Sequence, residues 1–136
     1  MRAVLDPNVL ISALLSAGGA PARIVARWLA GELELIVSEK LLDELDRALS
    51  YPKLQTRIAP DERGEFLALL RRSAIAAVDP ATPPKRSRDP GDDYLLALAE
   101  AERAVLVSGD VHLLELRNRL PVFDAGRFLE ELDSAR

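Results

Sequence analysis

The chain has 136 residues, of which 49% are apolar and 29% are charged, and its formal net charge is −4. This length allows one sizeable hydrophobic core, so we expect a single domain over residues 1–136. The sequence has no cysteine and only one histidine, which excludes disulfides, thiolate metal sites, cysteine nucleophiles and a pair of catalytic histidines within one chain.

No apolar stretch reaches the length of about 18 residues that a membrane span requires, and the first residues lack the pattern of a secretory signal. We therefore expect a cytoplasmic protein that does not insert into a membrane. The negative net charge argues against a surface that is positive throughout, but local basic patches remain compatible with a nucleic-acid partner.

Short apolar runs predict five strands that are buried on both faces. These runs cover residues 3–5, 34–37, 74–78, 104–107 and 121–123. The segments between them have helical periodicity, and the expected helices cover residues 8–15, 21–30, 39–49, 61–72, 92–102, 110–117 and 125–132. Ser38 is the expected cap of the third helix. Residues 79–91 are rich in proline and charge, which predicts an irregular loop.

Strands that alternate with helices predict an α/β fold, a three-layer α/β/α sandwich around a mainly parallel sheet of roughly five strands. In such folds the ligands bind beyond the carboxyl ends of the strands.

Acidic residues are expected to meet at that edge of the sheet. Asp6 directly follows the first strand, and Asp110 follows the fourth. Asp92 and Asp93 begin a helix whose N-terminus lies near the same edge. On the helix over residues 39–49, periodicity leaves Glu44 and Asp46 equally placed beside the leucine face.

Close carboxylates repel each other by about 1 kcal/mol per pair in water-like surroundings and by roughly 4 kcal/mol near a protein surface. Raised pKa values or bound cations relieve this repulsion, and oxygen ligands without cysteine favour Mg²⁺ or Mn²⁺. The alternative is that Asp6, Asp92 and Asp110 each only cap a helix. We favour the metal site, because the topology brings several acids to one place.

Four stretches of the sequence combine apolar runs with acids and serines: "VLDPNVLISALL", "LIVSEKLLDELDRAL", "RDPGDDYLLALA" and "LVSGDVHLL". In their order and spacing they resemble the PIN-domain family of metal-dependent nucleases, in particular the VapC-like toxin ribonucleases of toxin–antitoxin pairs. This resemblance implies metal-binding, catalytic acids at Asp6, Glu44, Asp92 and Asp110. Glu44 is thereby preferred to Asp46, and Asp93 remains an alternative ligand to Asp92.

The resemblance also implies supporting polar roles for Asn8, Ser12 and Ser108, for which local capping is the alternative. Two residues depart from the family pattern. Pro7 replaces the usual threonine or serine, and His112 stands where relatives often carry another acid. We expect the second metal to be bound differently there, although a half-exposed helix residue is the simpler reading of His112.

The reaction implied by the resemblance is hydrolysis of an RNA phosphodiester, with an antitoxin and a second copy of the chain as partners. Lys85, Arg86 and Arg88 precede Asp92 and are candidates for binding the RNA backbone, with a solvated loop as the alternative.

Other functions remain open. One is an interaction module with this fold and weakened catalysis, and another is a receiver-type signalling domain with Asp79 as phosphoacceptor. The latter lacks a lysine after the fifth strand. A haloacid-dehalogenase-like phosphatase requires a second acid at Asn8, and a serine hydrolase requires a Gly-x-Ser-x-Gly turn; the sequence has neither.

Overall fold

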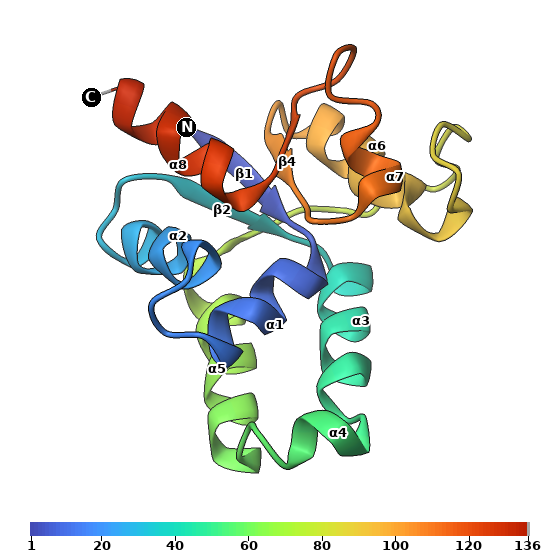
Figure 1. Ribbon diagram of the computed structural model, residues 1–136. Coiled ribbons are helices and arrows are strands. Elements are labelled where there is room, and N and C mark those ends of the chain that lie inside the picture. The colour runs from blue at the N-terminus through green and yellow to red at the C-terminus, as the bar shows by residue number, and fades with distance from the viewer. Residues whose placement is uncertain (136) are drawn as a thin grey trace.

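A five-stranded parallel sheet forms the centre of the computed structural model, which describes residues 1–135 (Figure 1). The strand order is β3-β2-β1-β4-β5, and every neighbouring pair is parallel. The strands are β1 (Arg2–Leu5), β2 (Glu34–Val37), β3 (Ile75–Ala76), β4 (Val105–Val107) and β5 (Val122–Phe123). The predicted α/β class and parallel sheet are confirmed.

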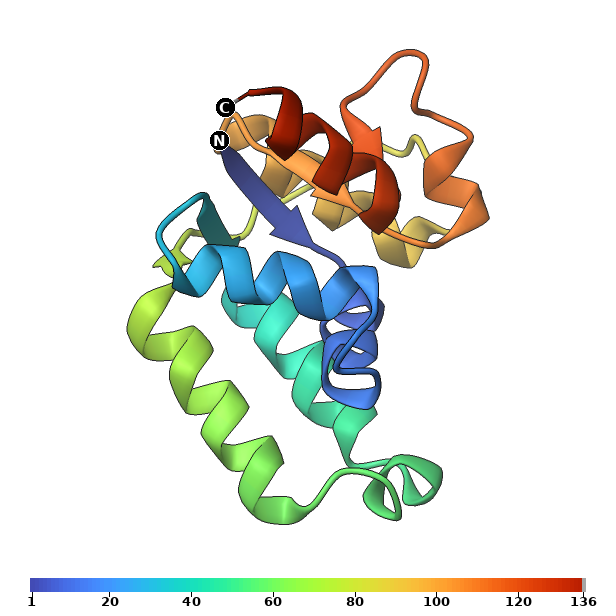
Figure 2. The ribbon, with the colours of Figure 1, turned by 60° about the vertical axis from the view of Figure 1, so that its left-hand side comes forward.

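Helices connect the strands and cover the sheet. They are α1 (Pro7–Leu15), α2 (Ala20–Leu29), α3 (Glu39–Leu49), α4 (Pro52–Gln55), α5 (Pro60–Ser73), α6 (Asp93–Ala101), α7 (Val111–Leu114) and α8 (Ala125–Ser134). A 3₁₀ turn, η1 (Pro90–Asp92), precedes α6. Figures 1 and 2 show α2 beside α8, whereas α6 packs against β1 and β4.

The core forms because the central strands and the helix faces bury their apolar side chains together. Val4, Leu106 and Ile36 are at most 1% exposed and lie on adjacent strands. On α3, Leu41, Leu42, Leu45 and Leu49 are all buried, as expected from their helical spacing. Ser38 caps this helix, because its side chain accepts a hydrogen bond from the N–H of Leu41.

The two outer strands differ from the prediction. β3 spans only two residues of the expected 74–78, and its Ile75 is half-buried and its Ala76 exposed. β5 likewise has one buried and one half-buried residue. The expectation of strands buried on both faces is therefore wrong at the edges of the sheet, where each strand pairs with one neighbour within residues 1–135.

Helix bounds also shift near the carboxyl edge of the sheet. The helix expected over residues 92–102 begins at Asp93, and the helix expected over residues 110–117 is the single turn α7. Asp110 is its N-cap and not its first helical residue. The short helix α4 was not predicted, because its four residues carry no apolar periodicity.

No single helix within residues 1–135 is long and apolar enough to cross a membrane. Helices α1 and α2 reach that length and apolarity only together, and they are bent by 97° relative to each other. Both helices supply buried residues to the core, among them Leu10 and Ile24.

Candidate metal centre

Asp6 connects the end of β1 to the start of α1. Its backbone N–H donates to the carbonyl of Val107 at 2.9 Å, which continues the pairing of β1 with β4. Its side chain caps α1 by accepting from the N–H of Asn8 at 3.0 Å, and Pro7 occupies the first helical position. Asp6 is 4% exposed. Asp6 therefore does cap α1, as the alternative interpretation expected. This hydrogen bond occupies one of about four lone-pair positions of the carboxylate, so others are available to further partners.

Ser108 joins Asp6 to the second acid at this edge, Asp110. The hydroxyl of Ser108 donates to Oδ2 of Asp6 at 2.8 Å and accepts from the backbone N–H of Asp110 at 3.0 Å. Ser108 is 0% exposed, so both partners are fixed by a buried group. Ser108 thus links Asp6, at the end of β1, to Asp110, which follows β4.

Asp92 completes the centre from the turn η1. Carboxylate oxygens of Asp89, Asp92 and Asp110 all lie within 4.8 Å of one another. The carboxyl groups of Asp92 and Asp110 are close enough to share a proton when one of them is protonated. We refer to Asp6, Asp89, Asp92 and Asp110 as the carboxylate cluster.

Burial and mutual repulsion raise the pKa values of two carboxyl groups in this cluster. Burial, the hydrogen bond with Asp110 and the charges of Asp6, Asp89 and Asp110 raise the pKa of Asp92 to about 7. Burial also raises the pKa of Asp6, and the charge of Asp110 adds to this, whereas the hydrogen bonds from Asn8 and Ser108 oppose it. The predicted electrostatic strain is therefore present in the folded chain.

Glu44 lies on α3 and, within the described residues, is not among the three acids whose oxygens lie within 4.8 Å of one another. Its Oε2 accepts a 2.7 Å hydrogen bond from the hydroxyl of Tyr94, a residue of α6 that is 1% exposed. Burial, this hydrogen bond and the charges of Glu44, Asp6 and Asp79 raise the pKa of Tyr94, so the phenol stays protonated and remains a donor. The competing acid Asp46 instead pairs with Arg63 at 2.7 Å.

Asp93 and His112, two further residues predicted for the site, have different surroundings. Asp93 is buried, but its Oδ1 accepts from the backbone N–H groups of Arg86 and Ser87, so it fastens the preceding loop. His112 donates its backbone N–H to Asp110, and its ring Nδ1 lies 3.7 Å from Oδ1 of the same residue.

The basic segment is partly engaged in ion pairs. Arg86 pairs with Glu100 at 2.6 Å, and Arg88 pairs with Glu115 at 3.3 Å. Lys85 is exposed. Of the three basic residues, Lys85 therefore has the side chain most available to a phosphate.

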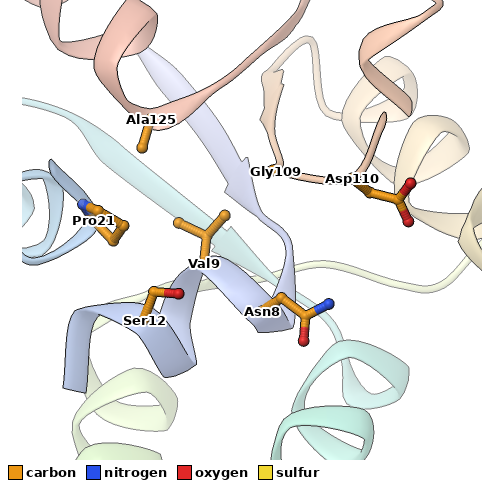
Figure 3. Close-up of a pocket in the computed structure, with 7 residues that line it drawn as sticks. All are labelled: Asn8, Val9, Ser12, Pro21, Gly109, Asp110 and Ala125. Carbon is orange, nitrogen blue, oxygen red and sulfur yellow. The ribbon is translucent and has the colours of Figure 1, made fainter. Parts of the chain in front are cut away.

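A pocket of about 330 Å³ adjoins the cluster at Asp110. We call it the side pocket (Figure 3). Its lining includes Asn8, Val9, Ser12, Pro21, Asp110 and Ala125. Asn8 and Ser12 are exposed, and within residues 1–135 their side chains make no hydrogen bond to the cluster.

Sequence reasoning missed Asp89 and Tyr94. Asp89 stands three residues before Asp92 and caps η1, since its Oδ1 accepts from the N–H of Gly91. An Asp-Pro-Gly turn directly before an acid was the available signal. Nothing in the spacing of Tyr94 indicated that its hydroxyl reaches a carboxylate on another helix.

The donor set fits a hard divalent cation. Every converging group is a carboxylate oxygen, and Oδ2 of Asp92 is buried without a hydrogen-bond partner within the described residues. A buried polar atom in that state is costly unless it is satisfied by an ion or water. Oxygen-rich sites of this kind suit Mg²⁺ and Mn²⁺ better than softer metals.

Comparison with known proteins identifies the family. The family model described as "PIN domain" matches residues 2–112, which contain every member of the cluster and Glu44. The chain belongs to the PIN domain family. PIN domains are generally nucleases, and in this PIN domain carboxylates of Asp89, Asp92 and Asp110 gather in one place.

Individual relatives are distant. An uncharacterised protein of Methanocaldococcus jannaschii, MJ1680, is 26% identical over 118 residues, covering 87% of this PIN domain and 76% of that protein. VapBC2 from Rickettsia felis, solved with a promoter DNA fragment, is similar at a TM-score of 0.61 and 16% identity over 90% of this chain and 97% of that chain. VapBC-1 from nontypeable Haemophilus influenzae is similar at a TM-score of 0.61 and 17% identity, over 93% of this chain and 99% of that chain. These likenesses show the shared fold.

Proposed function

We propose that this PIN domain, residues 1–136 acting as one nuclease domain, is a metal-dependent endoribonuclease and the toxin of a toxin–antitoxin pair. Two observations carry the proposal: carboxylate oxygens of Asp89 and Asp92, before α6, converge with one of Asp110, after β4, and Oδ2 of Asp92 is buried without a hydrogen-bond partner in the described residues. The resemblance of four sequence stretches to VapC-like ribonucleases supports RNA as the substrate.

Asp6, Glu44, Asp92 and Asp110 are the proposed ligands of Mg²⁺ or Mn²⁺, with Asp89 as a further acid. When bound, such an ion activates water and neutralises charge on the phosphate that is cut. Ser108 fixes Asp6 relative to Asp110, and Tyr94 fixes Glu44. His112 adds a backbone N–H to Asp110. Asp93 is proposed to act indirectly, by holding the loop that carries Asp89.

The substrate is expected to reach the cluster past the loop before η1. Lys85 is the proposed contact with the RNA backbone, with Arg86 and Arg88 exchanging their carboxylate partners for phosphates when RNA is bound. Exposed ion pairs contribute little to stability, so the exchange costs little at Arg88, which is 72% exposed.

The fold similarity to VapBC proteins supports an antitoxin as a partner. We also propose a homodimer and action in the cytoplasm, where the RNA substrate is present. Sedimentation of the purified chain, alone and after co-expression with the product of a neighbouring gene, tests both assemblies.

A signalling role of the receiver type is disfavoured. Asp79, its phosphoacceptor, uses Oδ2 to accept from the backbone N–H of Lys40 at 2.9 Å, and its Oδ1 is buried. Asp79 therefore holds the start of α3. An interaction module with weakened catalysis remains the second candidate, because Pro7 and His112 depart from the family pattern.

The deciding experiment measures cleavage of labelled RNA with Mg²⁺ or Mn²⁺, with and without a chelator, and with single-stranded DNA as a comparison substrate. Asp6→Asn, Glu44→Gln and Asp110→Asn should each abolish cleavage while circular dichroism shows an intact fold. Asp46→Asn, on the same helix as Glu44 but paired with Arg63, should cleave like the wild type. Undiminished cleavage by all three variants contradicts the proposal. Metal binding without any cleavage by the wild type favours the interaction module.

A further inference from the structure

The side pocket changes in polarity from one side to the other. Figure 3 shows Val9, Pro21 and Ala125 on one side, and Asn8 and Asp110 on the other. The polar side is continuous with the carboxylate cluster, because Asp110 belongs to both. A molecule that occupies the pocket therefore has its apolar part away from the metal centre and its polar part next to it.

Two polar side chains of the pocket have no role in holding the cluster. The amide of Asn8 and the hydroxyl of Ser12 are exposed, and among the described residues neither donates to a carboxylate of the cluster. Asn8 contributes to Asp6 only through its backbone N–H. The oxygen of Ser12 points across the pocket toward Asn8 in Figure 3. Both side chains are therefore available to a ligand.

We propose that the side pocket binds the base and ribose of the nucleotide adjoining the phosphate that is cut. This inference rests on the proposed function and adds a determinant of its sequence preference. The volume of about 330 Å³ lies at the lower end of the range of about 300–1,000 Å³ typical of small-molecule sites. It is sized for one nucleoside and not for a longer segment of RNA.

The chemistry of the lining fits a nucleobase. Val9, Pro21 and Ala125 offer apolar contacts to the flat face of a base. The amide of Asn8 presents a donor and an acceptor together, which matches the hydrogen-bonding edge of a base, and the hydroxyl of Ser12 adapts to either kind of partner. Asp110 places the phosphate side of the nucleotide at the metal centre. Among the residues that the structure describes, those lining the pocket are not aromatic, so the proposed contacts to the base are aliphatic.

Filling the pocket tests the proposal. Ser12→Leu and Ala125→Leu each place a larger apolar side chain in the pocket, from α1 and α8 respectively. Each variant should raise the KM for a mixed-sequence RNA by about ten-fold, the loss that corresponds to about 1.4 kcal/mol of binding free energy. Each should also change which bases flank the cut sites. Affinity for Mn²⁺, measured by calorimetry, should stay at the wild-type value, because the cluster is untouched.

Ala26→Leu is the matched control, because Ala26 is an exposed helical alanine of α2 outside the pocket. It should leave KM and the cut sites unchanged. An unchanged KM and cut-site pattern in both filled variants overturns the proposal. A fall in Mn²⁺ affinity of both variants also overturns it, because the pocket residues then act through the metal centre.

A binding measurement separates this inference from the proposed nuclease activity. Titration of isotope-labelled wild type with each of the four nucleoside 5′-monophosphates in Mg²⁺ should shift the amide signals of Asn8, Ser12 and Ala125 by amounts that depend on the base. This holds even if the wild type cleaves no RNA. Identical shifts with ribose 5-phosphate, or no shift at these residues, show that the pocket does not bind a base.

Discussion

The hydroxyl of Tyr94 donates a 2.7 Å hydrogen bond to Oε2 of Glu44, and this contact links α6 to α3. The ring of Tyr94 is buried, and Nζ of Lys40 lies 4.5 Å from its centroid. Glu44 is the one proposed ligand that is not attached to a strand end or to η1. Its position therefore depends on a donor from another helix.

Tyr94→Phe should weaken metal binding with only a modest loss of stability. The substitution keeps the ring in the core and removes one hydrogen bond to a carboxylate, which costs about 1–3 kcal/mol in buried cases and less here, because Glu44 is half-buried. Glu44 then becomes free to turn toward solvent. We expect Mn²⁺ affinity to fall several-fold by calorimetry. Tyr51→Phe, at a 51% exposed tyrosine, is the control, and equal behaviour of the two variants would contradict the proposed positioning role.

Stability of the metal-free protein should depend on Asp92. Its pKa of about 7 in the folded chain exceeds its ordinary value of 3.8, so between these pH values the folded state holds a proton that the unfolded state has lost. The free energy of unfolding should therefore fall as pH rises from about 4 to 7, by at most about 1.4 kcal/mol per pH unit for each such proton. The raised pKa of Asp6 acts in the same direction.

Urea denaturation in the presence of a chelator at several pH values measures this dependence. Asp92→Asn should flatten it, whereas Asp46→Asn, outside the cluster, should retain it. Divalent ions compete with the proton, so Mn²⁺ should stabilise the wild type more at pH 8 than at pH 5. The electrostatic account fails if Asp92→Asn has the same pH dependence as the wild type.

The sequence predicted those parts of the site that follow directly from the sheet. Asp6 directly follows β1, and Asp110 follows β4 after Ser108 and Gly109. Parallel pairing therefore places both at one edge, and the apolar runs before them are enough to find them. Helix α3 was predicted with its observed bounds for the same reason, since its leucines recur at helical spacing and Ser38 precedes them.

The rest of the site depends on contacts that periodicity does not encode. Glu44 and Asp46 flank the same apolar face of α3, and only their partners Tyr94 and Arg63 separate them in the structure. Asp89 lies in a proline-rich stretch without a repeating pattern, so its position is set by the local turn η1. Contacts between side chains that are distant in sequence form only in the folded chain, so a local sequence pattern does not predict them.

Ser108→Ala should disturb both neighbouring acids. The buried hydroxyl satisfies Oδ2 of Asp6 and the part-buried backbone N–H of Asp110. Its loss costs about 1–3 kcal/mol for the buried carboxylate oxygen and less for the N–H, which water can reach. Thermal or urea unfolding should show a loss of about 1–3 kcal/mol, together with reduced Mn²⁺ affinity. Ser50→Ala removes a hydroxyl that donates to the carbonyl of Asp46 and should change neither quantity much. Wild-type metal affinity in Ser108→Ala would show that this serine supports the fold alone.

Asp89→Asn should have opposite effects on the metal-free and metal-bound protein. Asparagine can still accept from the N–H of Gly91, so the turn η1 is kept, but one negative charge leaves the cluster. Without metal the substitution relieves repulsion, and the free energy of unfolding at pH 8 should rise slightly in a chelator. With metal the cluster lacks one carboxylate oxygen, and Mn²⁺ affinity should fall by about ten-fold. Asp124→Asn, another exposed capping acid, is the control for loss of charge alone. Equal Mn²⁺ affinity in Asp89→Asn and the wild type would show that Asp89 caps the turn without binding the ion.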